Sequence, residues 1–431
     1  MRYLLAIFFF VMYTGDNLGL NISLAPGVSV KNLLLYAIFT GIAINAAVAR
    51  NRSFELPTLF IPFGLLIVYA LITWIVASFI LAYPDYEMRE SFIRLKSSQV
   101  DQLLTFFIFF YGAMQLRDAY WLLRAIVWIA VLGNVVTLID AFDIPNLGIV
   151  EAKVRNDRFL GFIGSANGYG QFLVLFLPAT VAVYLTASRS VRPWAAVGVF
   201  ATAIALVLTG SRGAYVGLVA GSILAVIFLR KIISTQMIVR AGVITVFASA
   251  FVLAATLFTD YAEVYMESFA KFEGGTHIAT SGRSTIWSNA IKAMVENPAS
   301  FITGYGFNAY ESSRRFYAAT HNTYLNYLYN LGTIGLVLFM ATFTALLTAA
   351  RSVVQNASAT LRPQFIAMIF GLFCFLISIF FSEYHQSTYL LWAYLGVTMR
   401  IAMGVREGTN VEAGETSAHR PSRSDGLVTQ S

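Results

Sequence analysis

Residues 321–339 read HNTYLNYLYNLGTIGLVLF, and this stretch decides the fold. It opens an apolar run, 322–349, that is long enough to cross the hydrocarbon core of a membrane as a helix. His321 and Asn322 stand where a long polar segment enters this run. Polar groups are costly at such a depth, so those that occur there usually serve a function. The stretch therefore predicts a membrane helix with a functional group at its entrance.

The composition of the whole chain is that of an integral membrane protein. Of 431 residues, 58% are hydrophobic and only 12% are charged, whereas a soluble domain is about one quarter charged. Apolar runs recur at residues 3–13, 30–49, 57–82, 101–116, 119–140, 167–187, 193–209, 213–230, 237–259, 322–349, 363–381 and 386–403. They predict an all-α polytopic membrane protein with about twelve transmembrane helices.

The domain organisation follows from the same runs. We expect one membrane domain, residues 1–404, which includes a single sizeable outer loop at 260–321. Residues 405–431 are polar and rich in small and charged residues, and this composition predicts a disordered cytoplasmic tail.

The charge distribution predicts the orientation. A net charge of +7 could indicate nucleic acid binding in a soluble protein, but cytoplasmic loops of membrane proteins carry surplus Lys and Arg, so no nucleic acid partner is expected. If the N-terminus is cytoplasmic, the inner connections hold Arg50, Arg52, Arg117, Arg189, Arg192, Arg230, Lys231, Arg351, Arg362, Arg400 and Arg406. This pattern favours an even number of spans and two cytoplasmic termini.

Cysteine and histidine usage gives no sign of a disulfide framework or a metal centre. Cys374 is the single cysteine, and the four histidines are scattered without metal-ligand spacing. We therefore expect no metal and no other cofactor.

The outer loop contains one segment with helical periodicity, residues 284–297. Its apolar residues fall on one helix face: Ile286, Trp287, Ala290, Ile291, Met294 and Val295. An amphipathic helix in an outer loop is expected to lie along the membrane surface.

Three residues on the predicted outer side could carry chemistry: Arg212, Arg283 and His321. They fall at about one membrane depth and could converge. An arginine fork binds phosphate oxygens bidentately and keeps its charge. A histidine with a pKa near neutral can take a proton from an attacking hydroxyl. Together they predict glycosyl transfer from a sugar carried on a lipid diphosphate.

Structural interpretations stand beside this one. A lone arginine at a helix end is often a membrane anchor, and Arg283 could simply decorate a surface helix. Further candidates for substrate contacts are Asn322, Tyr324, Arg314, Arg315 and Glu383. The two adjacent arginines could instead bind headgroups of membrane lipids, the tyrosine could belong to the interfacial aromatic belt, and the glutamate could lie in an ordinary short loop.

Three blocks of the sequence resemble bacterial O-antigen ligases. The first is His321-Asn322 followed by nine residues and Gly332-Thr333-Ile334-Gly335, which is similar to the His-Asn-x9-Gly-x-x-Gly signature of that family. The others are Gly210-Ser211-Arg212-Gly213 and Gly282-Arg283-Ser284-Thr285-Ile286-Trp287, and they resemble blocks shared by the wider ligase and polymerase superfamily. The resemblance in order and topology covers roughly residues 160–400.

The resemblance implies an inverting, metal-independent glycosyltransferase of the bacterial inner membrane with its loop in the periplasm. Such enzymes take a polysaccharide from undecaprenyl diphosphate, and the ligases join it to lipid A–core oligosaccharide. By the same resemblance, His321 would be the base or acceptor-orienting residue, and Arg212 and Arg283 would bind the diphosphate.

Other functions remain open from the sequence. A polysaccharide polymerase of the same superfamily would share these blocks, and a protein-glycosylating transferase is a more distant possibility. A polysaccharide transporter would place charges deep in the bundle, whereas the charges here gather at the outer rim.

Overall fold

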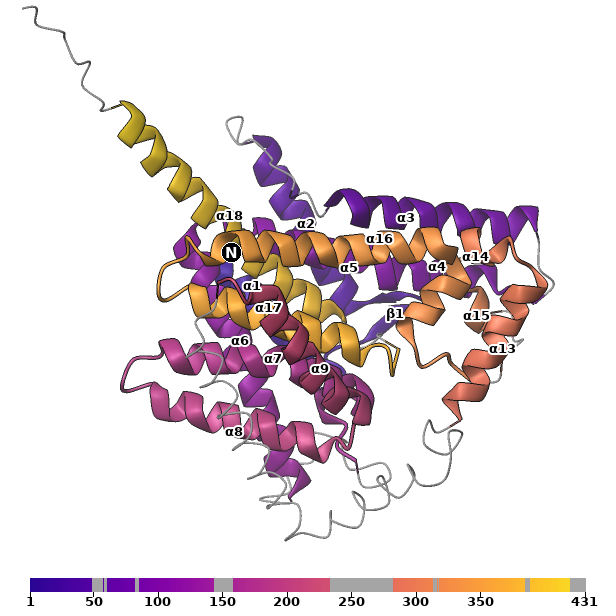
Figure 1. Cartoon of the computed structure of the whole chain (residues 1–431), viewed down its shortest axis with the longest axis horizontal. Coiled ribbons are helices and arrows are strands. Elements are labelled where there is room, and N and C mark those ends of the chain that lie inside the picture. The colour runs from indigo at the N-terminus through magenta and orange to yellow at the C-terminus, as the bar shows by residue number, and fades with distance from the viewer. Residues whose placement is uncertain are drawn as a thin grey trace, which may run out of the picture.

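The computed structural model describes residues 1–48, 57, 60–81, 85–142, 158–232, 282–312, 316, 318–383 and 388–418. Within these ranges the fold is all-α except for a hairpin of β1 (Ser23–Ala25) and β2 (Val28–Ser29) (Figure 1). The helical elements of the first half are α1 (Arg2–Thr14), α2 (Val30–Val48), α3 (Phe60–Ile75), the π-helical η1 (Val76–Ile80), α4 (Met88–Leu95), the π-helical η2 (Lys96–Val100), α5 (Asp101–Tyr111) and α6 (Leu116–Ala141). Those of the second half are the 3-10 turn η3 (Gly161–Ile163), α7 (Ala166–Thr186), α8 (Arg192–Leu208), α9 (Arg212–Leu229), α13 (Arg283–Glu296), α14 (Ser300–Thr303), α15 (Ala309–Ser312), α16 (Thr323–Val354), α17 (Arg362–Ser378) and α18 (Thr388–Ala418).

The helices are those of a membrane protein. Among the described residues, five helical segments are long and apolar enough to cross a membrane, and four shorter apolar helices accompany them. Each predicted apolar run overlaps a helix, apart from 237–259, which lies outside the described residues. Of the predicted loop 260–321, the structure describes 282–312, 316 and 318–321. The helix α18 continues through residue 418 into the segment for which the sequence predicts disorder.

The segment 88–100 is helical where hydropathy predicts a connection. Polar residues of this segment point into the protein, because they form an ion pair or hydrogen bonds there. The Lys96 ammonium lies 2.9 Å from the fully buried carboxylate of Asp101. That carboxylate also accepts hydrogen bonds from Asn32 at 2.9 Å and Tyr36 at 2.7 Å. The network ties α2 to the start of α5.

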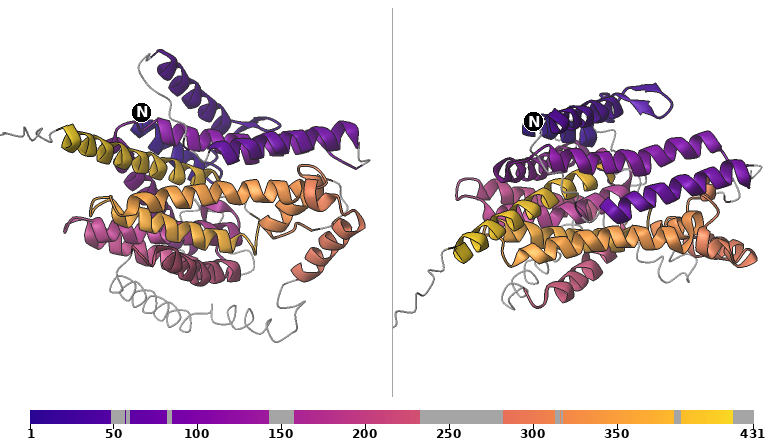
Figure 2. Two further views of the ribbon diagram at one scale, coloured as in Figure 1. Left: turned by 45° about the horizontal axis from the view of Figure 1, so that its top comes forward. Right: turned by 90° about the horizontal axis from the view of Figure 1, so that it is seen from above.

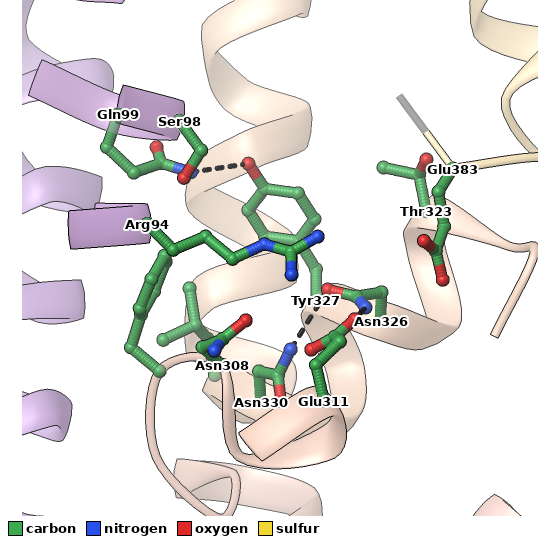
Figure 3. A pocket seen from close by; sticks show the side chains of 12 residues that line it. Arg94, Ser98, Gln99, Asn308, Glu311, Thr323, Asn326, Tyr327, Asn330 and Glu383 are labelled. Carbon is green, nitrogen blue, oxygen red and sulfur yellow. Dashed lines mark hydrogen bonds between the residues drawn. The ribbon is translucent and has the colours of Figure 1, made fainter. Parts of the chain in front are cut away.

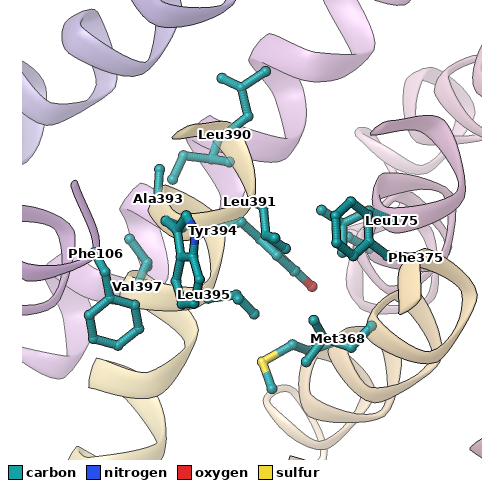
Figure 4. Close-up of a cluster of buried hydrophobic side chains, with 14 of the residues drawn as sticks. Phe106, Leu175, Met368, Phe375, Leu390, Leu391, Ala393, Tyr394, Leu395 and Val397 are labelled. Carbon is teal, nitrogen blue, oxygen red and sulfur yellow. The ribbon is translucent and has the colours of Figure 1, made fainter. Parts of the chain in front are cut away.

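The main core surrounds α17 and α18 (Figure 4). Phe106 of α5, Leu175 of α7 and Phe375 of α17 pack with residues 390–397 of α18. α17 approaches its neighbours through glycines. A Cβ added at Gly221 of α9 would lie 2.4 Å from the Cα of Cys374, and one at Gly371 would lie 2.5 Å from the carbonyl oxygen of Leu175. Small residues at helix contacts let backbones approach closely in membrane proteins, so the position of α9 against α17 is narrowly fixed.

A second, smaller core lies at the end of the molecule formed by α13, α14 and α15 (Figure 1). It packs Ala290 and Met294 of α13 and Tyr310 of α15 against Leu325 and Tyr329 of α16. The helix α13 is therefore docked on the protein by part of its apolar face, while Val295 on the same helix is 62% exposed. The N-terminus and the end of α18 lie toward the opposite end of the long axis in all three views (Figures 1 and 2).

The helix α16 is broken where it enters this outer region. Gly332 has φ 63° and ψ −169°, a conformation that side chains rarely adopt. The break leaves the carbonyls of Tyr329 and Asn330 available, and they accept the N–H groups of Tyr305 and Gly306, each at 2.9 Å. The turn at Gly304–Gly306 is thus bonded to α16, which explains why a glycine is suited to this position of the family signature.

Candidate functional site

The end of α17 and the residues that follow it, 379–383, hold the predicted site together. Arg212 is the first residue of α9. The next residue, Gly213, packs so closely that an added Cβ would lie 2.7 Å from the Cβ of Phe381. The close glycine contacts between α9 and α17 therefore place Arg212 next to the segment that ends in Glu383.

His321 is fixed to the same segment by backbone and side-chain hydrogen bonds. Its N–H donates to Glu383 Oε1 at 3.2 Å, and the hydroxyl of Thr320 donates to the same oxygen at 2.7 Å. Two residues later, Thr323 donates its N–H to the Ile379 carbonyl at 3.0 Å and its hydroxyl to the Ser382 carbonyl at 3.1 Å. His321 has φ 48°, which costs a non-glycine residue about 1 kcal/mol, and these bonds hold it there.

Arg283 reaches the site because α13 docks on both of these segments. The indole N–H of Trp287 donates to the Thr320 carbonyl at 2.8 Å, and its ring meets that of Phe380 edge-to-face at 5.5 Å. Arg283 is the first residue of the helix, one turn before Trp287. The apolar pattern of residues 284–297 therefore serves to place an arginine beside His321.

Three arginine charges act on one another in this region. Burial lowers the pKa of the Arg283 guanidinium, and the charges of Arg212 and Arg158 lower it further. Cations held close together in a partly buried place repel one another, and a bound anion relieves that repulsion. The arrangement is suited to an anionic group with several oxygens, such as a diphosphate.

Sequence reasoning missed Arg158. Its Nε donates to the Thr209 carbonyl at 2.8 Å, and its Nη2 donates to Asn167 Oδ1 at 3.0 Å. The same Asn167 oxygen accepts the Ser211 hydroxyl at 3.2 Å. Arg158 thus braces the turn that precedes Arg212. One signal in the sequence points to it. Like Arg212, Arg158 falls on the predicted outer side of the membrane, where the positive-inside rule expects few basic residues.

The imidazole of His321 lies between opposite charges. Burial lowers its pKa from the ordinary value, the carboxylate of Glu383 raises it, and the charge of Arg283 lowers it. The net direction is downward, so the imidazole is neutral at pH 7 and can accept a proton. This electrostatic setting is what a general base requires.

The structure places the remaining predicted residues as follows. Asn322 caps α16, its side-chain oxygen accepting the N–H of Leu325 at 3.1 Å. The Tyr324 hydroxyl donates to the Leu376 carbonyl at 2.6 Å and so links α16 to α17. Glu383 lies beside His321, as described above. Arg314 and Arg315 lie outside the described residues.

A polar cavity adjoins the site on the side of Glu383 (Figure 3). Its wall comes from α4 and η2, from the α15 region, from the outer turns of α16 and from Glu383, which follows α17 in the chain. The lining residues are Arg94, Ser98, Gln99, Phe307, Asn308, Glu311, Thr323, Asn326, Tyr327, Asn330, Leu331 and Glu383. Sequence reasoning missed this cavity, because Asn326 and Asn330 lie within a run assigned to the membrane.

Fold and site together define a polytopic α-helical membrane protein that gathers three arginines, a neutral histidine and a carboxylate at one end. A family model described as O-antigen ligase matches residues 196–340, a range that includes Arg212, Arg283 and His321. Over these residues, the match supports the family that the motifs indicated. No curated protein matches the chain.

Proposed function

We propose that the protein is a glycosyltransferase of the bacterial inner membrane. It moves an O-antigen polysaccharide from undecaprenyl diphosphate to lipid A–core oligosaccharide at the periplasmic face, with inversion and without a metal ion. One observation carries the proposal: Arg283 lies within electrostatic reach of both arginines, Arg158 and Arg212, and of His321. A diphosphate held by the arginines would therefore be adjacent to a base.

Each residue has a role in a single displacement. An acceptor hydroxyl attacks the anomeric carbon while the bond from that carbon to the diphosphate oxygen breaks. The hydroxyl proton passes to the neutral imidazole of His321, and the electron pair of the broken bond leaves with undecaprenyl diphosphate. Arg212 and Arg283 stabilise the departing diphosphate through charge-assisted hydrogen bonds. Attack opposite the leaving group inverts the anomeric centre.

The arrangement of the helices supports a periplasmic site. The site lies at the end formed by α13–α15, and both the N-terminus and the end of α18 lie toward the other end (Figure 2). Two termini at one end agree with an even number of spans. We propose about twelve spans, two cytoplasmic termini and a membrane domain over residues 1–404. The arrangement also places the arginines on the side where the charge rule expects few.

The test is transfer by purified enzyme in lipid vesicles with a lipid diphosphate donor and lipid A–core acceptor. His321→Ala and Arg212→Ala should each abolish transfer while still inserting into membranes, and Arg230→Ala at the far end of α9 is the matched control. Full activity of the first two variants would disprove the mechanism. Chelation of divalent metals should leave the rate unchanged.

The polysaccharide polymerase remains the alternative because both activities occur in this superfamily. The lipopolysaccharide of a strain that lacks the gene separates them. Accumulated lipid-linked polymer with unmodified core indicates a ligase, and a single repeat unit on the core indicates a polymerase.

A further inference from the structure

The polar cavity beside Glu383 is built mainly of groups that bind hydroxyls. Asn326 Nδ2 donates to Glu311 Oε1 at 2.5 Å, and Asn330 Nδ2 donates to Asn326 Oδ1 at 2.9 Å. Figure 3 shows these side chains and the guanidinium of Arg94 directed toward a common space. The cavity opens outward, and its empty space of about 510 Å³ includes this open mouth.

The wall is held rigidly before any ligand binds. Asn330 Oδ1 accepts the N–H of Tyr310 at 2.8 Å, which fixes α15 to α16. Gln99 Nε2 donates to the Tyr327 hydroxyl at 3.0 Å, which fixes η2 to the same helix. Polar side chains that are already ordered lose less entropy when a ligand binds. This order favours a specific binding site.

The cavity differs in charge from the group formed by Arg158, Arg212 and Arg283. It contains two carboxylates, Glu311 and Glu383, beside one guanidinium, Arg94. A diphosphate would be repelled by the carboxylates, whereas a neutral sugar offers hydroxyls that both donate and accept. Amide, carboxylate and guanidinium groups together satisfy both kinds of hydrogen bond.

The cavity also borders residues that hold His321, although His321 itself is not part of its lining. Two of its wall residues, Thr323 and Glu383, bracket His321: the first is two residues along the chain, and the second accepts the His321 N–H at 3.2 Å. A sugar bound there would lie near His321, and the arginines that act on this region would hold the donor.

We infer that this cavity binds the terminal sugar of the acceptor oligosaccharide through its hydroxyls and presents one of them to His321. The inference rests on the proposed glycosyl transfer and adds a division of the site: anionic donor on Arg158, Arg212 and Arg283, neutral acceptor on the amides of α16. Asn326 is the residue that best tests it, because it joins Glu311 to Asn330 at the centre of the wall.

A binding experiment separates this inference from the proposed reaction. Core oligosaccharide freed of lipid A is titrated into the full-length His321→Ala protein, where no turnover occurs. The double variant with Asn326→Leu should bind it about tenfold more weakly or worse, as expected for lost hydrogen bonds to buried polar partners. Asn289→Leu, an exposed asparagine on α13, is the matched control and should bind as before.

Kinetics in the otherwise unaltered enzyme give the second measurement. Asn326→Leu should raise the acceptor KM about tenfold and leave the donor KM nearly unchanged. Ser98→Phe, which fills the cavity from η2, should have the same effect. Because it leaves α16 unaltered, it shows that the effect of Asn326→Leu does not come from misfolding of α16. Unchanged oligosaccharide binding, or a donor KM that rises together with that of the acceptor, would overturn the assignment. Full transfer by His321→Ala would instead disprove the proposed reaction, whatever the cavity binds.

Discussion

Glu383 and His321 are joined by a hydrogen bond from the backbone N–H of the histidine to Oε1 of the carboxylate, at 3.2 Å. The carboxylate therefore acts on the histidine twice. It holds the residue at its positive φ of 48°, and its charge raises the pKa of the imidazole against the lowering by burial and Arg283. Glu383 also lines the polar cavity, so one side chain connects the proposed base to the proposed acceptor site.

The first prediction concerns pH. In the wild type, kcat/KM should fall as pH drops through the pKa of His321, which lies below the ordinary 6.5. Glu383→Gln keeps an oxygen that can accept both hydrogen bonds but removes the charge that raises this pKa. The acidic limb of the rate profile should therefore move to lower pH. A limb that stays in place or moves upward would show that His321 is not the titrating group.

Glu383→Ala is the companion variant. It removes the charge and also the acceptor for the Thr320 hydroxyl and the His321 N–H. We expect a larger loss of kcat than in Glu383→Gln at every pH, measured by the same transfer assay. Equal kcat values in the two variants would mean that the hydrogen bonds do not position the histidine.

The second prediction concerns Arg158. Arg158→Lys keeps a positive charge near Arg283 but cannot bond both Thr209 and Asn167 in the geometry of the fork. Transfer should fall roughly 10- to 100-fold, the range expected for hydrogen bonds to a charged group, and the donor KM should rise. Arg189→Lys, in the exposed connection before α8, should leave both values unchanged. A wild-type donor KM in Arg158→Lys would remove Arg158 from the site.

The third prediction concerns the contact between α9 and α17. Gly221→Ala places a methyl group 2.4 Å from the Cα of Cys374, so the helices must separate. Overpacking of this kind costs about 1–3 kcal/mol, and thermal unfolding in detergent should show it. Gly64→Ala in α3, where no atom lies within 4 Å of the added carbon, is the matched control. Equal unfolding temperatures in the two variants would contradict the close packing.

The fourth prediction concerns the buried ion pair at the start of α5. Lys96→Met leaves the carboxylate of Asp101 fully buried without its cation. Breaking a buried pair from one side costs about 3–5 kcal/mol, measured as a loss of unfolding free energy. Arg2→Met breaks the other described ion pair, whose carboxylate on Asp118 is 34% exposed, and should matter far less because water replaces the partner. Similar losses in the two variants would show that Asp101 is not isolated from water.

Hydropathy and charge located most of the architecture and the centre of the candidate site. Apolar runs coincide with helices wherever the structure describes them. Arg283 interacts electrostatically with both Arg212 and His321, which agrees with the expected convergence of the three residues. The family signature agrees with the match over residues 196–340.

What escaped prediction depends on contacts between segments far apart in the sequence. The helix at 88–100 was hidden because Lys96 and Asp101 neutralise each other only after folding. Arg158 acts through Thr209 and Asn167, and no pattern in the sequence around Arg158 predicts these partners. Asn326 and Asn330 lie in an apolar run, and they line a cavity only because α15 and η2 pack against α16.

The break at Gly332 has a consequence for how this region can change over evolutionary time. The loop at Tyr305–Gly306 is attached to α16 by main-chain N–H and C=O groups. Main-chain bonds do not depend on side-chain identity, so neighbouring positions such as Phe307 and Glu311 can be replaced without the loss of these two bonds. Both positions line the cavity. If the cavity binds the acceptor sugar as we infer, the glycine separates the attachment of the loop from the recognition of that sugar, and new acceptor preferences can arise by point substitution on a constant frame.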